Sequence, residues 1–395
     1  QIVHIIRTVL NYYYYSLTQF ILHSPFYLTM FSLMAPLTHT AESGSSTVIL
    51  IGGLLLCLAA TVYVTHRNRT PIKYHFLITI LCVVGVLFGF DYVIRPNEET
   101  SNYIYSFLIY GAFTIFFCAQ VVDFRYFLKS YSILTVICGL IMARDPLFDY
   151  QWSNNYMEFG FVSMLPAFAG AMILFTAFKY KISGLLMCLF FVELMIFANK
   201  GSVLTALILF IIGFSFFRNG NKINLKQITS IVFVLLILYL YYADIFLFFV
   251  GIADNLGVAS YSLNTMKLIL ENSSDNTVYD SRIDIWHNAL QYFHQNPIIG
   301  CGIGYYKSVS EGYEHNIILE VLNSWGIVGA ILLFVTLFKS VIRILKKISF
   351  SQQTTIISFL IIAILPLLTS MTFWAYQPFW AFITFSLLKP RKYYQ

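Results

Sequence analysis

Two neighbouring stretches of the chain are polar where the sequence around them is apolar: residues 281–304, SRIDIWHNALQYFHQNPIIGCGIG, and residues 314–329, EHNIILEVLNSWGIVG. They bring together charged, amide and histidine side chains with several glycines, and hydrophobic segments precede and follow them. Hydrophobic blocks on both sides of a polar island indicate a chain that enters and leaves a membrane repeatedly. We expect the island to hold the extracytoplasmic half of an active site.

The composition predicts an all-α, polytopic membrane protein. Hydrophobic residues make up 58% of the chain and charged residues 11%, with a mean hydropathy of +0.74, whereas a soluble domain carries about 25% charged residues. Apolar runs of about 18 to 23 residues recur, and each can cross a hydrocarbon core of about 30 Å as a helix. We expect residues 1–395 to form a single integral membrane domain.

The hydropathy pattern predicts about twelve transmembrane helices. They lie near 17–37, 47–64, 74–94, 103–121, 126–143, 157–178, 183–198, 202–217, 228–250, 316–338, 353–369 and 372–388.

Charge in the connecting loops predicts the orientation of these spans. Eighteen of the 24 Lys and Arg residues fall in alternate loops, and the positive-inside rule makes that side cytoplasmic, together with both termini. Residue 1 is Gln and no charged n-region with a cleavage site follows, so we expect no signal peptide. The other side keeps six cations: Arg95, Arg144, Lys200, Lys267, Arg282 and Lys307. Arg95 stands beside two glutamates and is interpreted as a solvated loop charge.

Several functional classes find no support in the sequence. Five of the six cysteines lie inside predicted spans and no CxxC spacing occurs, so neither a disulfide framework nor a metal site is expected. The basic residues are spread over short loops rather than gathered in one patch, which argues against a nucleic-acid partner. No P-loop, GxSxG or DxD motif appears, and we expect no cofactor.

A long periplasmic loop is predicted over 251–315, with a lid-like helix at 281–295. Ser281 as N-cap and Asp284 three residues later form a capping-box pattern. The helix is expected to present one apolar face, formed by Ile283, Trp286, Leu290 and Phe293. The glycines that follow, at 300, 302 and 304, indicate a tight re-entrant turn or are ordinary loop glycines.

Two cations on this side are candidates for binding an anion. Arg282 falls in the first turn of the predicted helix, where the helix dipole already places positive charge. Its partner is either Asp280 or Asp284 in a structural salt bridge, or a phosphate, for which a guanidinium is well suited. Lys200 is either an interfacial lysine or a second cation facing the same anion.

His315 and Asn316 stand where the long loop re-enters the membrane. A histidine there is either a helix cap or interfacial contact, or a proton acceptor near neutral pH, with Glu314 close enough in sequence to tune it. Gly326 and Gly329 on the same segment would permit close helix packing. Asn154 and Asn155 could donate hydrogen bonds to sugar or phosphate oxygens or be ordinary loop residues, and Arg144 could pair with Asp145.

The pattern of His315-Asn316, nine residues, then Gly326-x-x-Gly329 resembles the HN-x9-G-x-x-G signature of the O-antigen polymerase and ligase superfamily. The segment from Ser281-Arg282 through Trp286 to NPIIGCGIG resembles the family's other landmark, and ANKGSVLTAL stands where members usually have SRG or SRT. WSNNYMEFG resembles their asparagine-containing segment. The resemblance covers roughly residues 150 to 340.

This resemblance implies an inverting, metal-independent glycosyltransferase of the GT-C type, acting on the periplasmic face of the bacterial inner membrane. Donor and acceptor would be undecaprenyl-pyrophosphate-linked glycans, and a chain-length regulator protein is a candidate partner. His315 would accept or orient the proton of the attacking hydroxyl, Arg282 would bind the pyrophosphate, and Lys200 would replace the family's arginine without its bidentate geometry. Supporting or glycan-binding roles would fall to Glu314, Asn316, Asn154, Asn155, Trp286 and Arg144.

The resemblance leaves the acceptor open. A polymerase adds the chain to a new lipid-linked repeat unit, whereas a ligase transfers it to lipid A–core. The short interval between Arg282 and His315 and the very apolar, aromatic chain favour the polymerase. A flippase for the same lipid-linked units is the alternative from another class, and the absence of an evident two-half repeat in the sequence argues against it.

Overall fold

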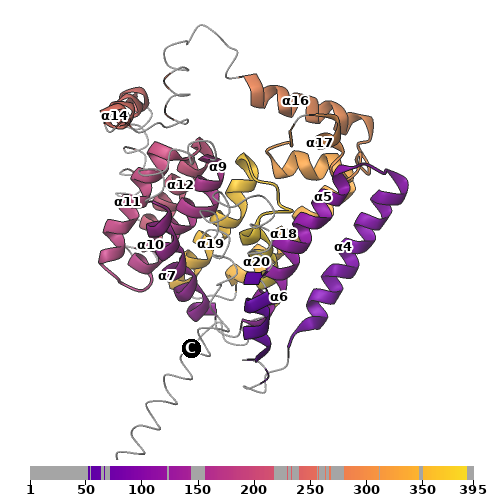
Figure 1. Ribbon diagram of the computed structural model, residues 1–395, viewed down its shortest axis with the longest axis horizontal. Helices are drawn as coiled ribbons and strands as arrows, with labels where there is room; N and C mark the ends of the chain where they lie inside the picture. Colours follow the sequence, from indigo (N-terminus) through magenta and orange to yellow (C-terminus); the bar gives the residue numbers. More distant parts are fainter. Residues whose placement is uncertain are drawn as a thin grey trace, which may run out of the picture.

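The computed structural model is entirely helical in the part of the chain that it describes (Figure 1). The described residues are 52–53, 55–63, 66, 72–121, 124–143, 156–217, 229, 233, 240–255, 257, 263, 267, 280–310, 312–346 and 350–388. Because these residues contain no strand, the structure confirms the all-α fold class.

Five helical stretches are long and apolar enough to cross a membrane: Tyr74–Ile94, Glu99–Gln120, Phe124–Met142, Phe159–Thr176 and Ile317–Arg343. Shorter apolar helices occupy Ile182–Phe197, Lys200–Ile211 and Ile357–Thr369. The chain is therefore a multi-pass membrane protein, while the number of twelve spans stays a prediction. The predicted span at 17–37 lies outside the described residues. The prediction of a span at 372–388 is wrong as drawn, because the helix there has 11 residues and rises only about 17 Å.

The first helices form one edge of the molecule. Helix α4 (Tyr74–Ile94) leads to a continuous helical rod of three segments, α5 (Glu99–Ser106), the π-helical η1 (Phe107–Ala112) and α6 (Phe113–Gln120). The rod brings the chain back beside the start of α4, where the Lys73 N–H donates to Gln120 Oε1 at 3.0 Å.

A compact group of helices follows. It comprises α7 (Phe124–Met142), the short α9 (Tyr156–Glu158), the π-helical η3 (Phe159–Met164), α10 (Leu165–Thr176), α11 (Ile182–Phe197) and α12 (Lys200–Phe217). Small residues let α7 and α10 pack backbone against backbone: a Cβ on Gly139 would lie 2.3 Å from Ala167 Cβ, and one on Gly170 would lie 2.3 Å from Thr135 Oγ1. Small residues at helix contacts are typical of membrane bundles, where no hydrophobic effect drives helices together.

The remaining helices carry the polar island and close the bundle. They are α14 (Tyr242–Asn255), α16 (Asp280–Gln295), α17 (Tyr305–Val309), α18 (Ile317–Lys346), α19 (Phe350–Thr369) and α20 (Gln377–Leu387). Helix α16 lies across one end of the bundle with α17 beneath it (Figure 1). The structure thus has a helix at the place predicted for the lid, beginning one residue earlier, while its function as a lid stays a prediction.

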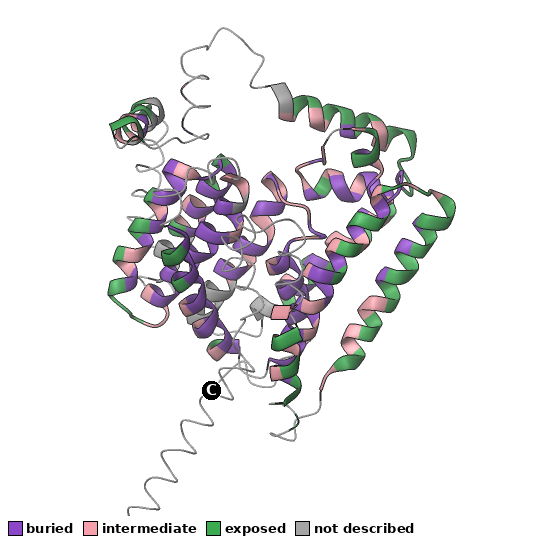
Figure 2. Cartoon of the chain, in the orientation of Figure 1, coloured by how far each residue is buried: buried purple, intermediate pink, exposed green. Residues whose placement is uncertain are grey.

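Two apolar cores meet along α7 and α19. One contains buried side chains of α4 to α7 and α18 to α20, and the other contains those of α7, η3, α10, α11, α12 and α19. Trp374, which is 1% exposed, lies at the centre of the first core and contacts Phe88 and Trp325 at centroid distances of 4.9 and 5.5 Å. The buried residues run through the middle of the bundle, and α4 has a mostly exposed surface (Figure 2).

The two ends of the bundle differ in charge and irregularity. One end carries Lys73 and Lys129, and the ammonium of Lys129 lies over the rings of Phe178 and Tyr180 at 5.8 and 5.6 Å. The other end carries α16, α17 and the first residues of α12 and α18 (Figure 1). The assignment of the loops to opposite sides of a membrane by their charge stays a prediction.

Candidate active site at the α16–α18 end

Helix α18 is broken at Gly326, whose φ of 64° and ψ of −162° lie outside the helical region. The break frees the carbonyl groups of Asn323 and Ser324 and the N–H groups of Ile327 and Val328, which an unbroken helix would pair with each other. Inside a membrane protein these groups need other partners, because an unpaired backbone group in an apolar environment costs several kcal/mol.

The loop that follows α16 supplies partners for all four groups. Cys301 N–H donates to Asn323 O (2.6 Å), Gly302 N–H to Ser324 O (3.2 Å), Ile327 N–H to Pro297 O (2.9 Å) and Val328 N–H to Ile298 O (3.2 Å). This approach needs glycine, since a Cβ on Gly326 would lie 2.4 Å from the Ile298 carbonyl and one on Gly300 would lie 2.6 Å from Gly326 N. The glycine run is therefore a re-entrant turn. Gly326 allows a loop to approach α18 closely, whereas the sequence predicted that it would allow close packing of another helix.

The turn between α4 and α5 holds the same glycine loop from its other side. Arg95 Nη1 donates to the carbonyl groups of Ile299 (3.2 Å) and Gly300 (2.6 Å), and the Ile303 N–H donates to Asp91 Oδ2 at 3.0 Å. The interpretation of Arg95 as a solvated loop charge is therefore wrong. The guanidinium binds the loop carbonyls, a contact that no local sequence pattern could indicate across some 200 residues.

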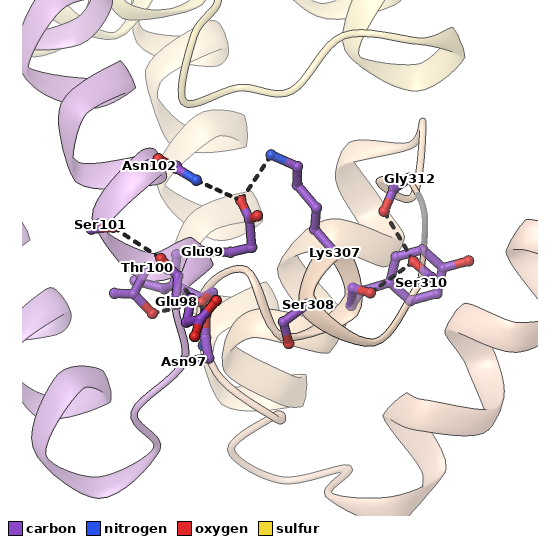
Figure 3. A network of polar contacts seen from close by, with 12 residues as sticks. Asn97, Glu98, Glu99, Thr100, Ser101, Asn102, Lys307, Ser308, Ser310 and Gly312 are labelled. Atoms are coloured by element: carbon purple, nitrogen blue, oxygen red, sulfur yellow. Dashed lines mark hydrogen bonds and ion pairs between the residues drawn. The ribbon is translucent and has the colours of Figure 1, made fainter.

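Polar contacts continue from this turn to α17, as Figure 3 shows. Lys307 Nζ lies 2.8 Å from Glu99 Oε2, and Asn102 donates to the same oxygen at 3.0 Å. Asn97 and Thr100 both donate to the carbonyl of Ile303. The polar loop is thus bonded to the α4–α5 turn at several points, and these contacts hold in place the segment that precedes α18.

His315 lies two residues before α18 with a left-handed backbone, φ 53°. A non-glycine residue in that region costs of order 1–3 kcal/mol and is a frequent feature of functional sites. Its Nδ1 lies 3.3 Å from the carbonyl oxygen of Ser370, in the link between α19 and α20, and its ring lies 4.0 Å from the ring of Tyr313.

The Ser370 contact defines which ring nitrogen can act as a base. A carbonyl oxygen can only accept, so in the bond to Ser370 O it is Nδ1 that carries the hydrogen, and a neutral ring then has its lone pair on Nε2; the Ser370 hydroxyl, 3.5 Å from the same nitrogen, could donate only to the other tautomer. Burial lowers the pKa of His315, the Ser370 hydrogen bond raises it, and the positive charge of Arg282 lowers it further. The imidazole is therefore neutral, oriented and available as a proton acceptor at neutral pH.

The neighbours of His315 have structural contacts of their own. Asn316 caps α18, because its Oδ1 accepts from the Ile318 N–H at 2.9 Å. Glu314 is buried, and its Oε1 accepts from Asn323 Nδ2 at 3.2 Å. Burial raises the pKa of the Glu314 carboxyl to about 7. Glu314 is therefore hydrogen-bonded to Asn323 of α18. The sequence instead predicts that it lies close enough to tune the imidazole of His315.

Lys200 is an exposed residue within a tightly packed turn. Asn199 caps α12 by accepting from the Ser202 N–H at 3.3 Å, and both residues are buried. A Cβ on Gly201 would lie 2.8 Å from Thr369 Oγ1, at the end of α19. The close packing of Gly201 against α19 fixes the backbone of this turn, and the ammonium stands at the N-terminus of an 18-residue helix, a favourable place for an anion.

Arg282 lies in the first turn of α16 and is half-buried. Among the side chains that the structure describes it has no ion pair, so Asp284, which is exposed, is not its partner; the side chain of Asp280, the other predicted partner, lies outside them. The predicted apolar face is partly wrong: Ile283 and Leu290 are 59% and 41% exposed, while Ala289 is fully buried. The buried side of α16 is rotated from the predicted one and includes Trp286, whose buried Nε1 lacks a hydrogen-bond partner.

Arg282, Lys200 and His315 come together although they are far apart in the sequence. The charge of Arg282 acts on both Lys200 and His315, and also on Tyr313. Arg282 is thus close enough to Lys200, at the N-terminus of α12, and to His315 for its charge to lower the pKa of both, and neither cation has an ion pair with a described acidic side chain. Such an arrangement can bind an anion and accept a proton next to it.

Some predicted site residues cannot be placed. Arg144, Asn154 and Asn155 lie outside the described residues. Across the described chain, no group of three or more His, Cys, Asp or Glu side chains could hold a metal ion.

Sequence reasoning missed three residues of this region. Tyr313 stacks on His315, Ser370 accepts from it, and Glu320 is a buried acid on α18. The signal for Glu320 was present, because an acid inside a predicted span marks a functional candidate. No sequence signal could have identified Ser370, since it acts through its backbone carbonyl.

Comparison with known proteins finds a family match in the central part of the chain. Residues 184–334 match a family model described as O-antigen ligase. No curated protein and no solved structure matches the chain significantly. The matched segment contains Lys200, Arg282 and His315, and it ends beyond the glycine pair at 326 and 329.

Proposed function

We propose a glycosyl-transfer function of the O-antigen polymerase and ligase type for this chain, and the family match over residues 184–334 supports it. The substrate class is a glycan carried on a polyprenyl pyrophosphate, and the preferred activity is polymerisation, in which the glycan moves onto a lipid-linked repeat unit. The site would face the periplasm from the inner membrane, in a fold of the GT-C type, with both termini cytoplasmic. The region 251–315 would act as the lid-bearing loop.

Each residue of the site has a distinct part in this reaction. A hydroxyl of the acceptor sugar attacks the anomeric carbon as the bond from that carbon to the pyrophosphate oxygen breaks, and a single displacement inverts the configuration. His315 Nε2 takes the hydroxyl proton, because Nδ1 is held by Ser370. Arg282 and Lys200 bind the departing pyrophosphate and stabilise its growing negative charge.

The observation that carries the proposal is the electrostatic interaction of Arg282 with both Lys200 and His315 at one end of the bundle. A phosphate is the ligand that two cations and a helix N-terminus suit best. A neutral histidine beside them suits a reaction in which a hydroxyl loses its proton as a phosphate leaves. A transporter of the same lipid would need the cations but has no use for an oriented base.

The cations are tested by substitution in a chain-elongation assay with purified protein and a lipid-pyrophosphate repeat unit. Removing one charge-stabilising donor typically slows turnover by about 10² to 10³-fold. We expect Arg282→Ala to fall in that range and Lys200→Ala to lose less, since an ammonium lacks the bidentate fork. Arg343→Ala and Lys181→Ala, both exposed at the opposite end, are matched controls that should retain activity. Elongation unchanged by Arg282→Ala would contradict its assigned role.

Ligation is the second candidate, because the family description itself is O-antigen ligase. The same site could transfer the glycan to lipid A–core if that acceptor binds. Incubation with the lipid-linked repeat unit alone separates the two activities. A ladder of products without a second acceptor supports the polymerase, product that forms only after lipid A–core is added supports the ligase, and no product with either contradicts glycosyl transfer.

A further inference from the structure

Glu320 is a buried acid for which the reaction described above has no use. It lies in the first turn of α18, is 3% exposed and stands in a segment apolar enough to span a membrane. Burying an acid is costly unless its oxygens receive hydrogen bonds. Two donors meet this need: the hydroxyl of Thr372 and the backbone N–H of Phe373.

Both donors belong to the link between α19 and α20, the segment that also contacts His315. Ser370 in this link is fully buried, and its carbonyl is the acceptor for His315 Nδ1. Ser370 and Met371 both donate their N–H groups to the carbonyl of Pro366, which closes the end of α19. Because Thr372 is two residues from Ser370, the contact of Thr372 with Glu320 and the contact of Ser370 with His315 belong to one short segment.

The charges around Glu320 make its contacts sensitive to substitution. Glu314 is the nearest acid that acts on it, and the hydroxyls of Tyr103 and Tyr313 interact electrostatically with the same carboxyl. No cation faces Glu320 among the described residues. The hydrogen bonds from the α19–α20 link are therefore what hold Glu320 in place.

We infer that Glu320 is a positioning residue for His315: it anchors the α19–α20 link to α18 and so keeps the Ser370 carbonyl on Nδ1. It does not touch substrate. The inference rests on the proposed function insofar as His315 is the proton acceptor, but the position of the imidazole can be measured without any glycosyl transfer.

Glu320→Gln tests this with little change of shape. The amide keeps one acceptor oxygen and replaces the other with an NH2 group that cannot accept, so only one oxygen is left to serve both the Thr372 hydroxyl and the Phe373 N–H. We expect the link to loosen, Nδ1 to lose its acceptor and kcat for elongation to fall about 10-fold or more with KM for the donor unchanged. Since the Ser370 bond raises the pKa of His315, its loss should move the acid limb of the pH profile to lower pH.

The direct readout is the rate at which diethyl pyrocarbonate modifies His315, followed by mass spectrometry across pH. This reagent attacks neutral imidazole, so the midpoint reports the ionisation of His315 itself. Glu320→Gln and Thr372→Val should each shift the midpoint downward, and the double variant should shift it no further, because both act through one contact. Thr372→Ser, which keeps the hydroxyl, and Glu98→Gln, an exposed acid, should match the wild type.

The outcomes separate this inference from the proposed function. A midpoint that Glu320→Gln and Thr372→Val both leave unchanged overturns the inference, whatever the enzyme does. If Glu320→Gln does not fold, the comparison of Thr372→Val with Thr372→Ser decides it in the same way. If the variants show the expected shifts in midpoint but the wild-type protein forms no product, the proposed function is overturned. The positioning role of Glu320 then still holds.

Discussion

Helices α18 and α19 are both interrupted within the bundle, but their interruptions are satisfied in different ways. In α18 the break at Gly326 frees four backbone groups, and the loop after α16 binds all of them through its own backbone. In α19 the ring of Pro366 removes one donor, and the hydroxyl of Tyr376 donates to the Ile362 carbonyl, four residues earlier, at 2.7 Å. The freed backbone groups of α18 are paired by a whole loop, whereas the freed carbonyl of α19 is paired by one side chain.

Both interruptions lie near the candidate site, and in both the freed backbone groups keep hydrogen-bond partners. The break in α18 is hydrogen-bonded to the loop after α16. It therefore connects the helix that carries Arg282 to the helix that begins after His315. The α19 break precedes Ser370, the acceptor for the same histidine. Both interruptions therefore border the site, and irregular backbone at membrane depth is tolerated where protein groups re-satisfy it. If this is right, disrupting the α18 junction should do more damage than disrupting the α19 one.

The largest effect is expected for Gly326→Ala. The new Cβ would lie 2.4 Å from the Ile298 carbonyl and would also occupy a backbone conformation that only glycine adopts readily. We expect a loss of about 3 to 5 kcal/mol of stability, or no folded protein, measured by thermal unfolding in detergent. Gly89→Ala on α4, where nothing lies within 4 Å of the new atom, is the matched control and should unfold like the wild type. Equal stability of the two variants would contradict the junction.

A smaller loss is expected for Tyr376→Phe. It removes one hydroxyl and leaves the Ile362 carbonyl unpaired in a buried place, which costs about 1–3 kcal/mol. The fold should survive, with a lower unfolding temperature and an otherwise normal transition. Tyr92→Phe, at a tyrosine that is 63% exposed, is the control and should change little. A loss as large as that of Gly326→Ala would remove the distinction between the two breaks.

A further effect concerns the pH dependence of stability. Burial raises the pKa of Glu314 from 4.5 to about 7 in the folded protein. The folded state therefore holds a proton that the unfolded chain releases at lower pH, so this stabilisation is complete below about pH 4.5 and is lost as pH rises through about 7. The unfolding temperature of the wild type should fall over this range, and Glu314→Gln, which cannot ionise, should remove that part of the fall. An identical pH dependence in both proteins would contradict the burial argument.

The sequence could predict elements and candidates but not the contacts between them. Hydropathy placed α4 at the residues where the structure has it, because an uninterrupted apolar run has few alternatives. It could not anticipate that Gly326 breaks α18, since a glycine in an apolar helix is compatible with simple close packing. The part played by Arg95 depends on a loop some 200 residues away, and that of Ser370 depends on a backbone carbonyl, so neither leaves a local trace.

The most direct measurement of the central claim is single-turnover elongation by His315→Ala, with the folded state checked by the wild-type unfolding transition. His294→Ala, at an exposed histidine on α16, is the matched control. The proposed site predicts that His315→Ala loses about 10² to 10⁴-fold in rate while His294→Ala elongates normally. Undiminished elongation by folded His315→Ala would contradict the assignment of the imidazole as the proton acceptor, and with it the site on which the proposed function rests.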